Sequence, residues 1–243
     1  MATYEELLKR TQAMATRIAE STGVDKEFVT KVLHYTKSLV SLQSPDEIDD
    51  LIFCAQLGLR FGISSRYHLQ LMFEAMCMPR KKTIQVEDFA RMICIFYSNR
   101  LDEKIDFVFQ VYNFNKTGFI RMADLFQMLK TCFVPFGEDD PVEQLKELVD
   151  LLLGVVDTDQ DGTISLEEFR SFVRKDILCL ELFGRVLPTE QILKSFYDLL
   201  NSKSYQAIKE YFLNERKKSL GENVAAIDQE TSGLFPGIVL QMP

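Results

Sequence analysis

Several features that mark common protein classes are missing from this sequence of 243 residues. No apolar run approaches the roughly 18 residues that a membrane-spanning helix requires, so no such helix is expected. Residues Met1–Glu6 have no apolar stretch of the signal-peptide type and lack the glycine that N-myristoylation requires. We therefore expect a cytoplasmic protein that has no membrane partner.

Basic residues are too few for a nucleic-acid-binding surface. The chain has 28 Lys and Arg residues against 36 Asp and Glu residues, which gives a net charge of −8. Nucleic-acid binding generally needs a basic face, so this charge argues against a nucleic-acid partner. It is consistent with clustered carboxylates that bind a cation.

Residues that hold zinc or perform catalysis are also sparse. The two histidines, His34 and His68, lie far apart on predicted helices and are typical of packing or surface residues. The cysteines are scattered, expected to be reduced, and without metal-binding spacing: Cys54, Cys77, Cys94, Cys132 and Cys179. No nucleophile-and-base arrangement and no glycine-rich phosphate loop is present, so the chain is not expected to be an enzyme.

Apolar residues recur with the helical period through most of the chain, which predicts an all-α fold. One helix is expected to start at Ser44 and run to Leu59, because Ser44 is a capping residue, Pro45 suits the first turn and Glu47 completes a capping box. The other expected helices cover residues 4–20, 25–40, 65–76, 190–200 and 203–218, with an irregular tail at 220–243.

A helix–loop–helix pattern occurs three times, with loops that begin near Cys77, Asn113 and Asp157. The interval between the last two contains a polar linker, residues 135–141, which is a candidate boundary between two lobes. In such repeated units the loops carry the ligands, so the loop residues decide whether a unit binds an ion.

The loop Asp157–Glu168 has oxygen donors at the spacing of a calcium-binding loop, because a hard cation takes six to eight oxygen ligands. Gly162 permits the left-handed turn that wraps the loop, and Ile164 is expected to pair with a neighbouring loop in a short two-stranded bridge. The expected Ca²⁺ ligands are Asp157, Asp159, Asp161, the backbone carbonyl of Thr163 and both oxygens of Glu168, with Ser165 acting through a water.

Two other loops keep the skeleton of this unit, the EF-hand, but have lost ligands. In Asn113–Asp124, Gly118 and Ile120 hold their places, whereas a single carboxylate, Asp124, remains. The loop Cys77–Asp88 is further degraded, with Pro79 and Lys81 at ligand positions and Lys82 in place of the turn glycine. We interpret it as a hand kept for packing, and its basic run, residues 80–82, as a solvated loop tip rather than a partner contact.

EF-hands work in pairs, which predicts an even number of them. Residues 25–60 are therefore predicted to form a fourth, vestigial hand, whose connector Ser41–Ser44 is too short to enclose an ion. Calcium is then expected to act on the second lobe alone.

The segment after residue 180 leaves two alternatives open. It contains an apolar stretch at 180–187 and a stripe of Leu193, Phe196, Tyr197 and Leu200 on the next helix. Permanent packing in the groove of the second lobe is favoured; alternatively, calcium loosens this cap and a partner helix replaces it. The apolar tail segment Leu234–Leu240 is expected to dock on the body or on a partner.

The chain resembles the four-hand calcium sensors related to calcineurin B and the neuronal sensors, and in particular the calaxins of cilia and flagella. The resemblance rests on residues 61–64, 101–104, 118–120, the loop 157–168, and residues 180–184 with Leu187-Pro188. It implies calcium-dependent association with the outer dynein arm, its docking complex or tubulin in the axoneme. The departures are that this chain keeps one acidic loop where calaxin-like proteins usually keep three, and that a helix and tail follow residue 203.

Three functions are compatible with this sequence. The favoured one is a calcium sensor or adaptor of the ciliary or flagellar axoneme. The alternatives are a regulatory subunit of a soluble kinase or phosphatase, and a structural microtubule-associated protein with a residual ion site. The expected divisions are an N-terminal helix (1–24), a first EF-hand lobe (25–98), a second lobe with the intact hand (99–180), C-terminal helices (181–219) and an irregular tail (220–243).

Overall fold

The computed structural model describes residues 4–40, 46–78, 81–137, 140–203, 205–207 and 210. Most of the predicted helix 203–218 and the whole predicted tail, including Leu234–Leu240, lie outside the described residues. So do Pro79, Arg80 and the predicted helix start at Ser44 and Pro45.

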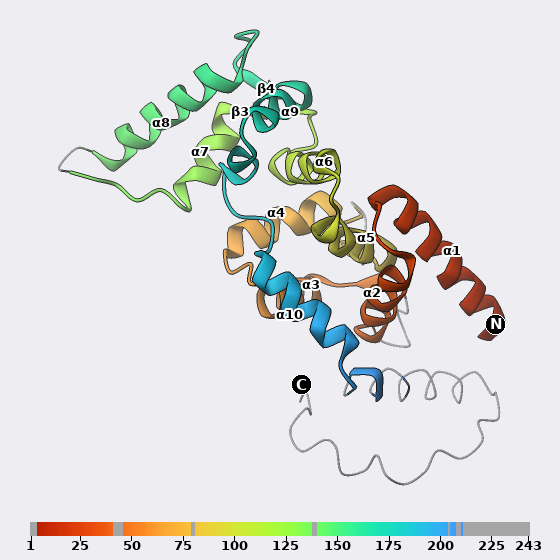
Figure 1. The fold of residues 1–243 in the computed structure, drawn as a ribbon. Helices are drawn as coiled ribbons and strands as arrows, with labels where there is room; N and C mark the ends of the chain where they lie inside the picture. Colours follow the sequence, from red (N-terminus) through yellow and green to blue (C-terminus); the bar gives the residue numbers. More distant parts are fainter. Residues whose placement is uncertain are drawn as a thin grey trace.

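The structure is mostly helical with short paired strands, which confirms the predicted fold class. Figure 1 shows a helical body with α10 lying against α3, and with α8 and the strands β3 and β4 at the opposite end. The elements are α1 (Tyr4–Thr22), α2 (Lys26–Ser38), β1 (Glu47–Ile48), α3 (Asp50–Phe61), α4 (Arg66–Met76), β2 (Ile84–Gln85), α5 (Val86–Tyr97), α6 (Leu101–Tyr112), β3 (Phe119–Arg121), α7 (Met122–Lys130), α8 (Pro141–Val156), β4 (Thr163–Ser165), α9 (Leu166–Lys175), the 3₁₀ helix η1 (Ile177–Glu181) and α10 (Glu190–Asn201).

Two antiparallel strand pairs join the hands in twos. Strand β1 pairs with β2, with Ile48 opposite Ile84, and β3 pairs with β4, with Ile120 opposite Ile164. All four isoleucines are fully buried, so each pair fixes two loops side by side over the core. The expected bridge at Ile164 is therefore confirmed. Below, the first hand pair denotes α2–α5 and the second hand pair denotes α6–α9.

The predicted start of the third helix is wrong. Residues 47–48 form β1, and α3 begins only at Asp50, where the Asp49 carboxylate accepts a hydrogen bond from the Ile52 N–H at 2.8 Å. Local capping signals at residues 44–47 are overridden because Ile48 is buried by pairing with Ile84. Helix α2 ends at Ser38 and α3 begins at Asp50, and the predicted connector Ser41–Ser44 between them lies outside the described residues.

The polar linker at 135–141 does not separate the hand pairs. It joins α7 to α8, and the strands on its two sides, β3 and β4, pair with each other. Asp140 caps α8 by accepting a hydrogen bond from the Val142 N–H at 2.8 Å, and Pro141 occupies the first turn. The linker is therefore an internal connection of the second hand pair.

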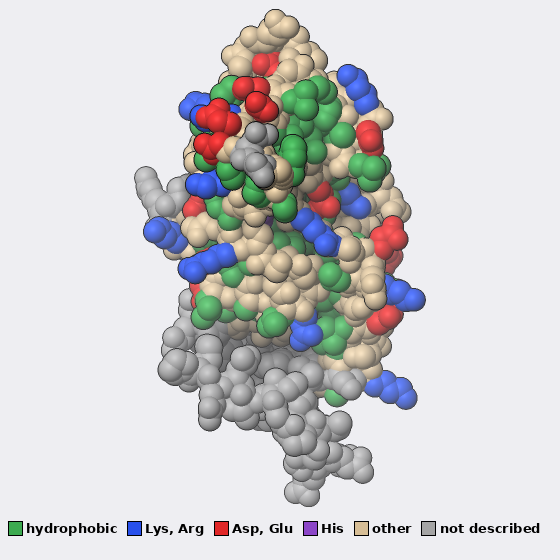
Figure 2. All heavy atoms as spheres, turned by 90° about the vertical axis from the view of Figure 1, so that its left-hand side faces the viewer, with side chains coloured by type: hydrophobic (Ala, Val, Ile, Leu, Met, Phe, Trp, Pro, Cys, Tyr) green, Lys and Arg blue, Asp and Glu red, His purple; other side chains and the backbone are tan. Residues whose placement is uncertain are grey.

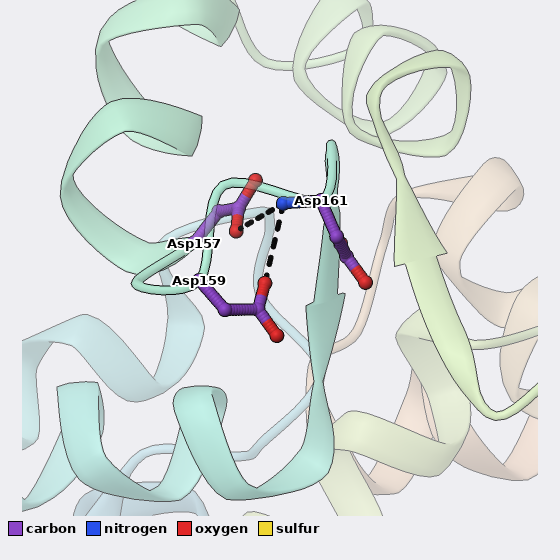
Figure 3. A group of neighbouring side chains, drawn as sticks. All are labelled: Asp157, Asp159 and Asp161. Carbon is purple, nitrogen blue, oxygen red and sulfur yellow. Dashed lines mark hydrogen bonds between the residues drawn. The ribbon is translucent and has the colours of Figure 1, made fainter.

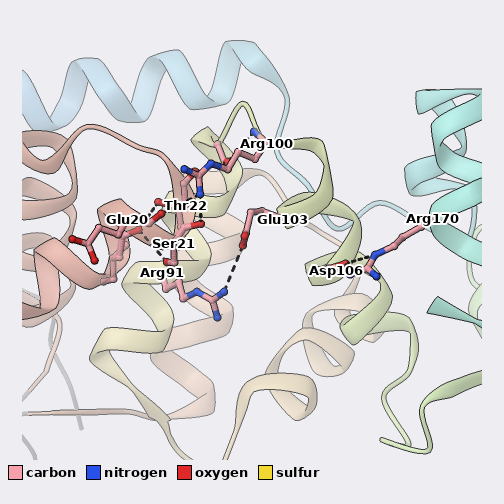
Figure 4. Close-up of polar contacts among 10 residues, drawn as sticks. Glu20, Ser21, Thr22, Arg91, Arg100, Glu103, Asp106 and Arg170 are labelled. Carbon is pink, nitrogen blue, oxygen red and sulfur yellow. Dashed lines mark hydrogen bonds and ion pairs between the residues drawn. The ribbon is translucent and has the colours of Figure 1, made fainter. Parts of the chain in front are cut away.

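The hand pairs meet along α5 and α6, and polar contacts span this region (Figure 4). Arg91 on α5 forms an ion pair with Glu103 on α6 at 3.5 Å, and Asp106 on α6 forms one with Arg170 on α9 at 2.6 Å. Helix α1 is tied to the same region, since Arg100 donates to the backbone carbonyls of residues 20 and 21 at 3.0 Å. These contacts surround the helices that connect the two pairs.

The segment after α9 divides its packing between the two hand pairs. Phe183 is fully buried and contacts Tyr112 and Phe169 of the second pair, as the favoured interpretation required. Helix α10, however, packs on α2 and α3 of the first pair, so its predicted position in the groove of the second lobe is wrong (Figure 1). The apolar stripe predicted that one side of α10 is buried, but it did not predict which surface buries that side. That surface depends on where the preceding segment places the helix.

The cysteines and histidines differ in burial: Cys94 and His68 are buried, whereas Cys132 is exposed. All five cysteines are free thiols. His68 is buried, and burial lowers its pKa, although the Phe183 carbonyl and the Glu181 carboxylate oppose that effect. Among the described residues, no helix combines the length and apolar character needed to cross a membrane.

Candidate metal centre

Three aspartates of one loop lie close together between α8 and α9. Asp157 directly follows the last residue of α8, and carboxylate oxygens of Asp157, Asp159 and Asp161 all lie within 4.8 Å of one another. Asp157 is buried, whereas Asp159 and Asp161 are exposed. In the part of the chain that the structure describes, this is the one group of three or more potential acidic, histidine or cysteine ligands at such spacing.

The backbone wraps around these carboxylates because two residues adopt left-handed conformations. Gln160 has φ 61° and Gly162 has φ 83°, and the second value explains the requirement for glycine. The Asp161 N–H donates to one oxygen of Asp157 and one of Asp159, each at 3.2 Å (Figure 3). The Gly162 N–H donates to the other oxygen of Asp157 at 2.8 Å. The aspartates are thus oriented by the loop itself.

Of the remaining predicted ligands, Glu168 is not a member of this close group, and Thr163 contacts it through Asp161. Thr163 lies in β4 and donates to Asp161 Oδ1 through its N–H and its hydroxyl, at 2.8 and 2.7 Å. Glu168 is in the first turn of α9, where its Oε2 accepts from the N–H and hydroxyl of Ser165 at 2.9 and 2.8 Å. Ser165, predicted to act through a water, therefore caps α9 in this structure.

Glu168 also reaches across to the start of the loop. Its Oε1 accepts from the N–H of Thr158 at 2.7 Å and from the Thr158 hydroxyl at 3.1 Å. Burial opposes ionisation, but the Ser165 and Thr158 hydrogen bonds outweigh it and lower the pKa of Glu168 to about 2. Sequence reasoning missed Thr158, because nothing in the ligand pattern marks the residue after Asp157.

The loop concentrates negative charge. The Asp161 N–H lowers the pKa of Asp159, but burial and the neighbouring carboxylates of Asp161, Glu168 and Asp157 outweigh it, so the net shift is upward. A cation placed among these groups would relieve that repulsion. Because all the donors are oxygens, the group fits a hard cation of the calcium type rather than zinc or copper.

The neighbouring loop, Asn113–Asp124, is held closed by its own side chains. The Asn115 amide donates to Asp124 Oδ1 at 2.8 Å, and the Arg121 N–H donates to Asp124 Oδ2 at 3.1 Å. Asn113 accepts from the Thr117 N–H at 3.1 Å. An amide donor thus satisfies the carboxylate that would otherwise face an ion, while Gly118 keeps the turn at φ 88°.

In the loop of the second hand, lysines stand where a turn glycine and an ion ligand are expected. Lys82 stands at the turn-glycine position and takes a left-handed conformation with φ 51°. Lys81, at a former ligand position, forms an ion pair with Glu47 of β1. Its ammonium therefore contacts another part of the same hand pair, which agrees with a loop kept for packing.

The fold and the acidic loop define an EF-hand protein. The EF-hand domain pair family matches residues 102–174, which cover both hands of the second pair. The chain is 31% identical to calaxin from Xenopus laevis over 150 residues, 61% of this chain and 72% of that relative. It is 34% identical to calaxin from Danio rerio over 114 residues, 46% of this chain and 54% of that relative.

The chain belongs to the calaxin family. A shorter similarity joins it to the type 2 calcineurin B protein from Rattus norvegicus, 42% identical over 73 residues, 30% of this chain and 40% of that relative. Membership of the calaxin family makes the chain a non-enzymatic EF-hand protein.

Proposed function

We propose that this protein is a calcium sensor or adaptor of the ciliary or flagellar axoneme that binds one Ca²⁺ in the loop Asp157–Glu168. The observation that carries the proposal is the group of three aspartates, already oriented by the N–H groups of Asp161 and Gly162. Similarity to the calaxins supplies the axonemal setting, with the outer dynein arm, its docking complex or tubulin as partner.

The protein residues would hold the ion in the way that their chemistry dictates. Asp157, Asp159 and Asp161 offer carboxylates, Thr163 its carbonyl, and Glu168 both oxygens once it exchanges its bonds to Thr158 and Ser165 for the cation. The bound ion would supply charge neutralisation and would tie the first turn of α9 to the loop. That link makes the angle between α8 and α9 sensitive to calcium.

Calorimetric titration of metal-free protein with CaCl₂ tests the ion site. We expect one equivalent with Kd on the order of micromolar or above, because the partner loop supplies no second ion. Asp157→Ala should abolish this binding, whereas Asp124→Ala should leave it in place. No heat of binding at millimolar calcium would refute the proposal.

The axonemal assignment has its own test. The tagged protein is expected along the axoneme of ciliated cells and to co-purify with dynein-arm, docking-complex or tubulin components. Recovery of a kinase or phosphatase without any of these would favour the alternative of a regulatory subunit. The local similarity to the type 2 calcineurin B protein is the observation on which that alternative rests.

A further inference from the structure

The carboxylate of Glu168 accepts hydrogen bonds from both ends of its own loop. Its Oε2 accepts from the N–H and the hydroxyl of Ser165 at 2.9 and 2.8 Å. Its Oε1 accepts from the N–H and the hydroxyl of Thr158 at 2.7 and 3.1 Å, and from the Asp159 N–H at 3.4 Å. Each oxygen therefore has at least two donors, and a cation can bind an oxygen only if it replaces some of them.

The two sets of bonds direct the carboxylate differently. Ser165 is the cap of α9, and its bonds to Glu168 complete the capping box of that helix. Thr158 lies ten residues before Glu168, so its bonds direct Oε1 toward the start of the loop. Glu168 is accordingly not a member of the aspartate group, whose carboxylate oxygens lie within 4.8 Å of one another.

The hydroxyl is the part of this contact that depends on the identity of residue 158. Every residue except proline carries a backbone N–H, whereas a second donor to Oε1 requires a hydroxyl at this position. The Thr158 side chain is exposed, so its replacement does not disturb the core. Valine has the shape of threonine without the donor, and serine keeps the donor.

Calcium and magnesium make different demands on Glu168. Calcium takes six to eight oxygens at roughly 2.3–2.6 Å, and in a loop of this kind the closing glutamate supplies both of its oxygens. Magnesium takes six ligands at roughly 2.0–2.1 Å and keeps several of its waters. One oxygen of Glu168 is then sufficient for magnesium, and Oε1 can stay with Thr158. Breaking the Thr158 contact is therefore a cost that falls on calcium alone.

We propose that Thr158 is a selectivity-determining residue of this loop, because its hydroxyl competes with calcium for Glu168 Oε1 and thereby narrows the preference for calcium over magnesium. The proposal rests on the proposed calcium binding and deepens it. The loop then binds calcium more weakly than its carboxylates alone allow. Magnesium, which leaves the Thr158 contact in place, is the ion that competes with calcium at this site.

The experiment titrates the full chain with CaCl₂ and, separately, with MgCl₂ in a calorimeter. Thr158→Val should lower the calcium Kd about fivefold, the size expected for one exposed hydrogen bond, and should change the magnesium Kd less than about twofold. Thr158→Ser should reproduce both values of the unchanged chain. Circular dichroism checks that the variants are folded. Because both ions bind the same loop, a general change in loop stability would move both constants together.

Infrared difference spectra of the carboxylate stretch give a second readout, since a glutamate that binds through both oxygens differs from one that binds through one. We expect the signature of two-oxygen binding with calcium and not with magnesium. Glu168→Gln should remove it, which assigns the band to this residue. The same band with both ions would contradict the selectivity mechanism.

Failure of the inference and failure of the proposed function give different results. If the unchanged chain binds calcium but Thr158→Val leaves the calcium Kd within about twofold, or lowers both Kd values by the same factor, the role of Thr158 is overturned alone. Equal behaviour of Thr158→Ser and Thr158→Val would also overturn it. If the unchanged chain binds no calcium at millimolar concentration, the proposed function is overturned as well.

Discussion

The two hand pairs retain different features of the EF-hand. In the first pair, Lys81 of a degraded loop forms an ion pair with Glu47, and α10 covers the aromatic side chains of Phe28, Tyr35 and Phe61. The second pair keeps the aspartate group. It also carries exposed apolar side chains on α8 and on the segment before it: Val134, Phe136, Val142, Leu151 and Val155.

Exposed apolar side chains occur on both pairs, since Leu51 and Leu59 of α3 are 74% and 81% exposed. Figure 2 views the side on which α8 lies in Figure 1, and hydrophobic side chains gather there beside acidic ones. The aspartate group and the surface that receives α10 thus lie in different pairs of one chain.

The largest expected effect concerns the covered face of the first pair. Phe61→Ala removes a fully buried ring that contacts Phe96 and Phe196, and should lower the free energy of unfolding by about 3–5 kcal/mol. Phe136→Ala, at a 72% exposed position, should change it by less than about 0.5 kcal/mol. Urea unfolding measures both. Equal effects would contradict the described difference in burial.

Gly184→Ala tests the point where the segment between η1 and α10 meets His68 of the first pair. The new Cβ would collide with His68, and φ is 130° at this residue, so we expect a loss of about 2–4 kcal/mol. Gly154→Ala in α8 is the control, since beyond the adjacent residues and the helix's own backbone nothing lies within 4 Å of its Cβ position, and alanine favours a helix. Thermal unfolding should move in opposite directions for the two variants; a shared direction would argue against the close packing at Gly184.

A smaller effect is expected at the closed loop of the third hand. Asn115→Ala removes the amide that donates to Asp124, and should cost about 1–2 kcal/mol because a hydrogen bond to a carboxylate is lost. Lys116→Ala, also in this loop but with an exposed side chain, serves as the comparison in urea unfolding. If calcium restored the lost stability of Asn115→Ala, the loop would have to be counted as an ion site.

The smallest effect is a pH dependence at His68. Burial lowers the pKa of this imidazole below the ordinary 6.5, so the unfolded chain takes up a proton first as pH falls. Stability from the neutral ring is complete above pH 6.5 and is lost as pH falls from there toward the lowered pKa. His68→Asn should flatten this part of the stability profile. Identical profiles from about pH 7 to 5 would show that the ring titrates normally.

Local patterns in the sequence predicted much of the candidate site. The aspartates, Gly162 and Ile164 act within one loop and one strand pair, so spacing alone could identify them. The start of α3 could not be predicted in this way, because Ile48 pairs with Ile84, which is distant in the sequence. Nor could the surface that receives α10, since an amphipathic stripe indicates which side is buried but not what buries it. The role of Thr158 could not be predicted, because its hydrogen bond to Glu168 depends on the folded loop.

The contrast between the two loops of the second pair is tested most directly by residue-resolved nuclear magnetic resonance during a calcium titration. The Gly162 N–H donates to Asp157, and Gly118 occupies the equivalent turn in the neighbouring loop. We predict a large, saturable shift of the Gly162 amide signal at one equivalent of calcium, with only a small change at Gly118 through the strand pair. A saturable shift centred on Gly118, or no shift at Gly162, would contradict this prediction.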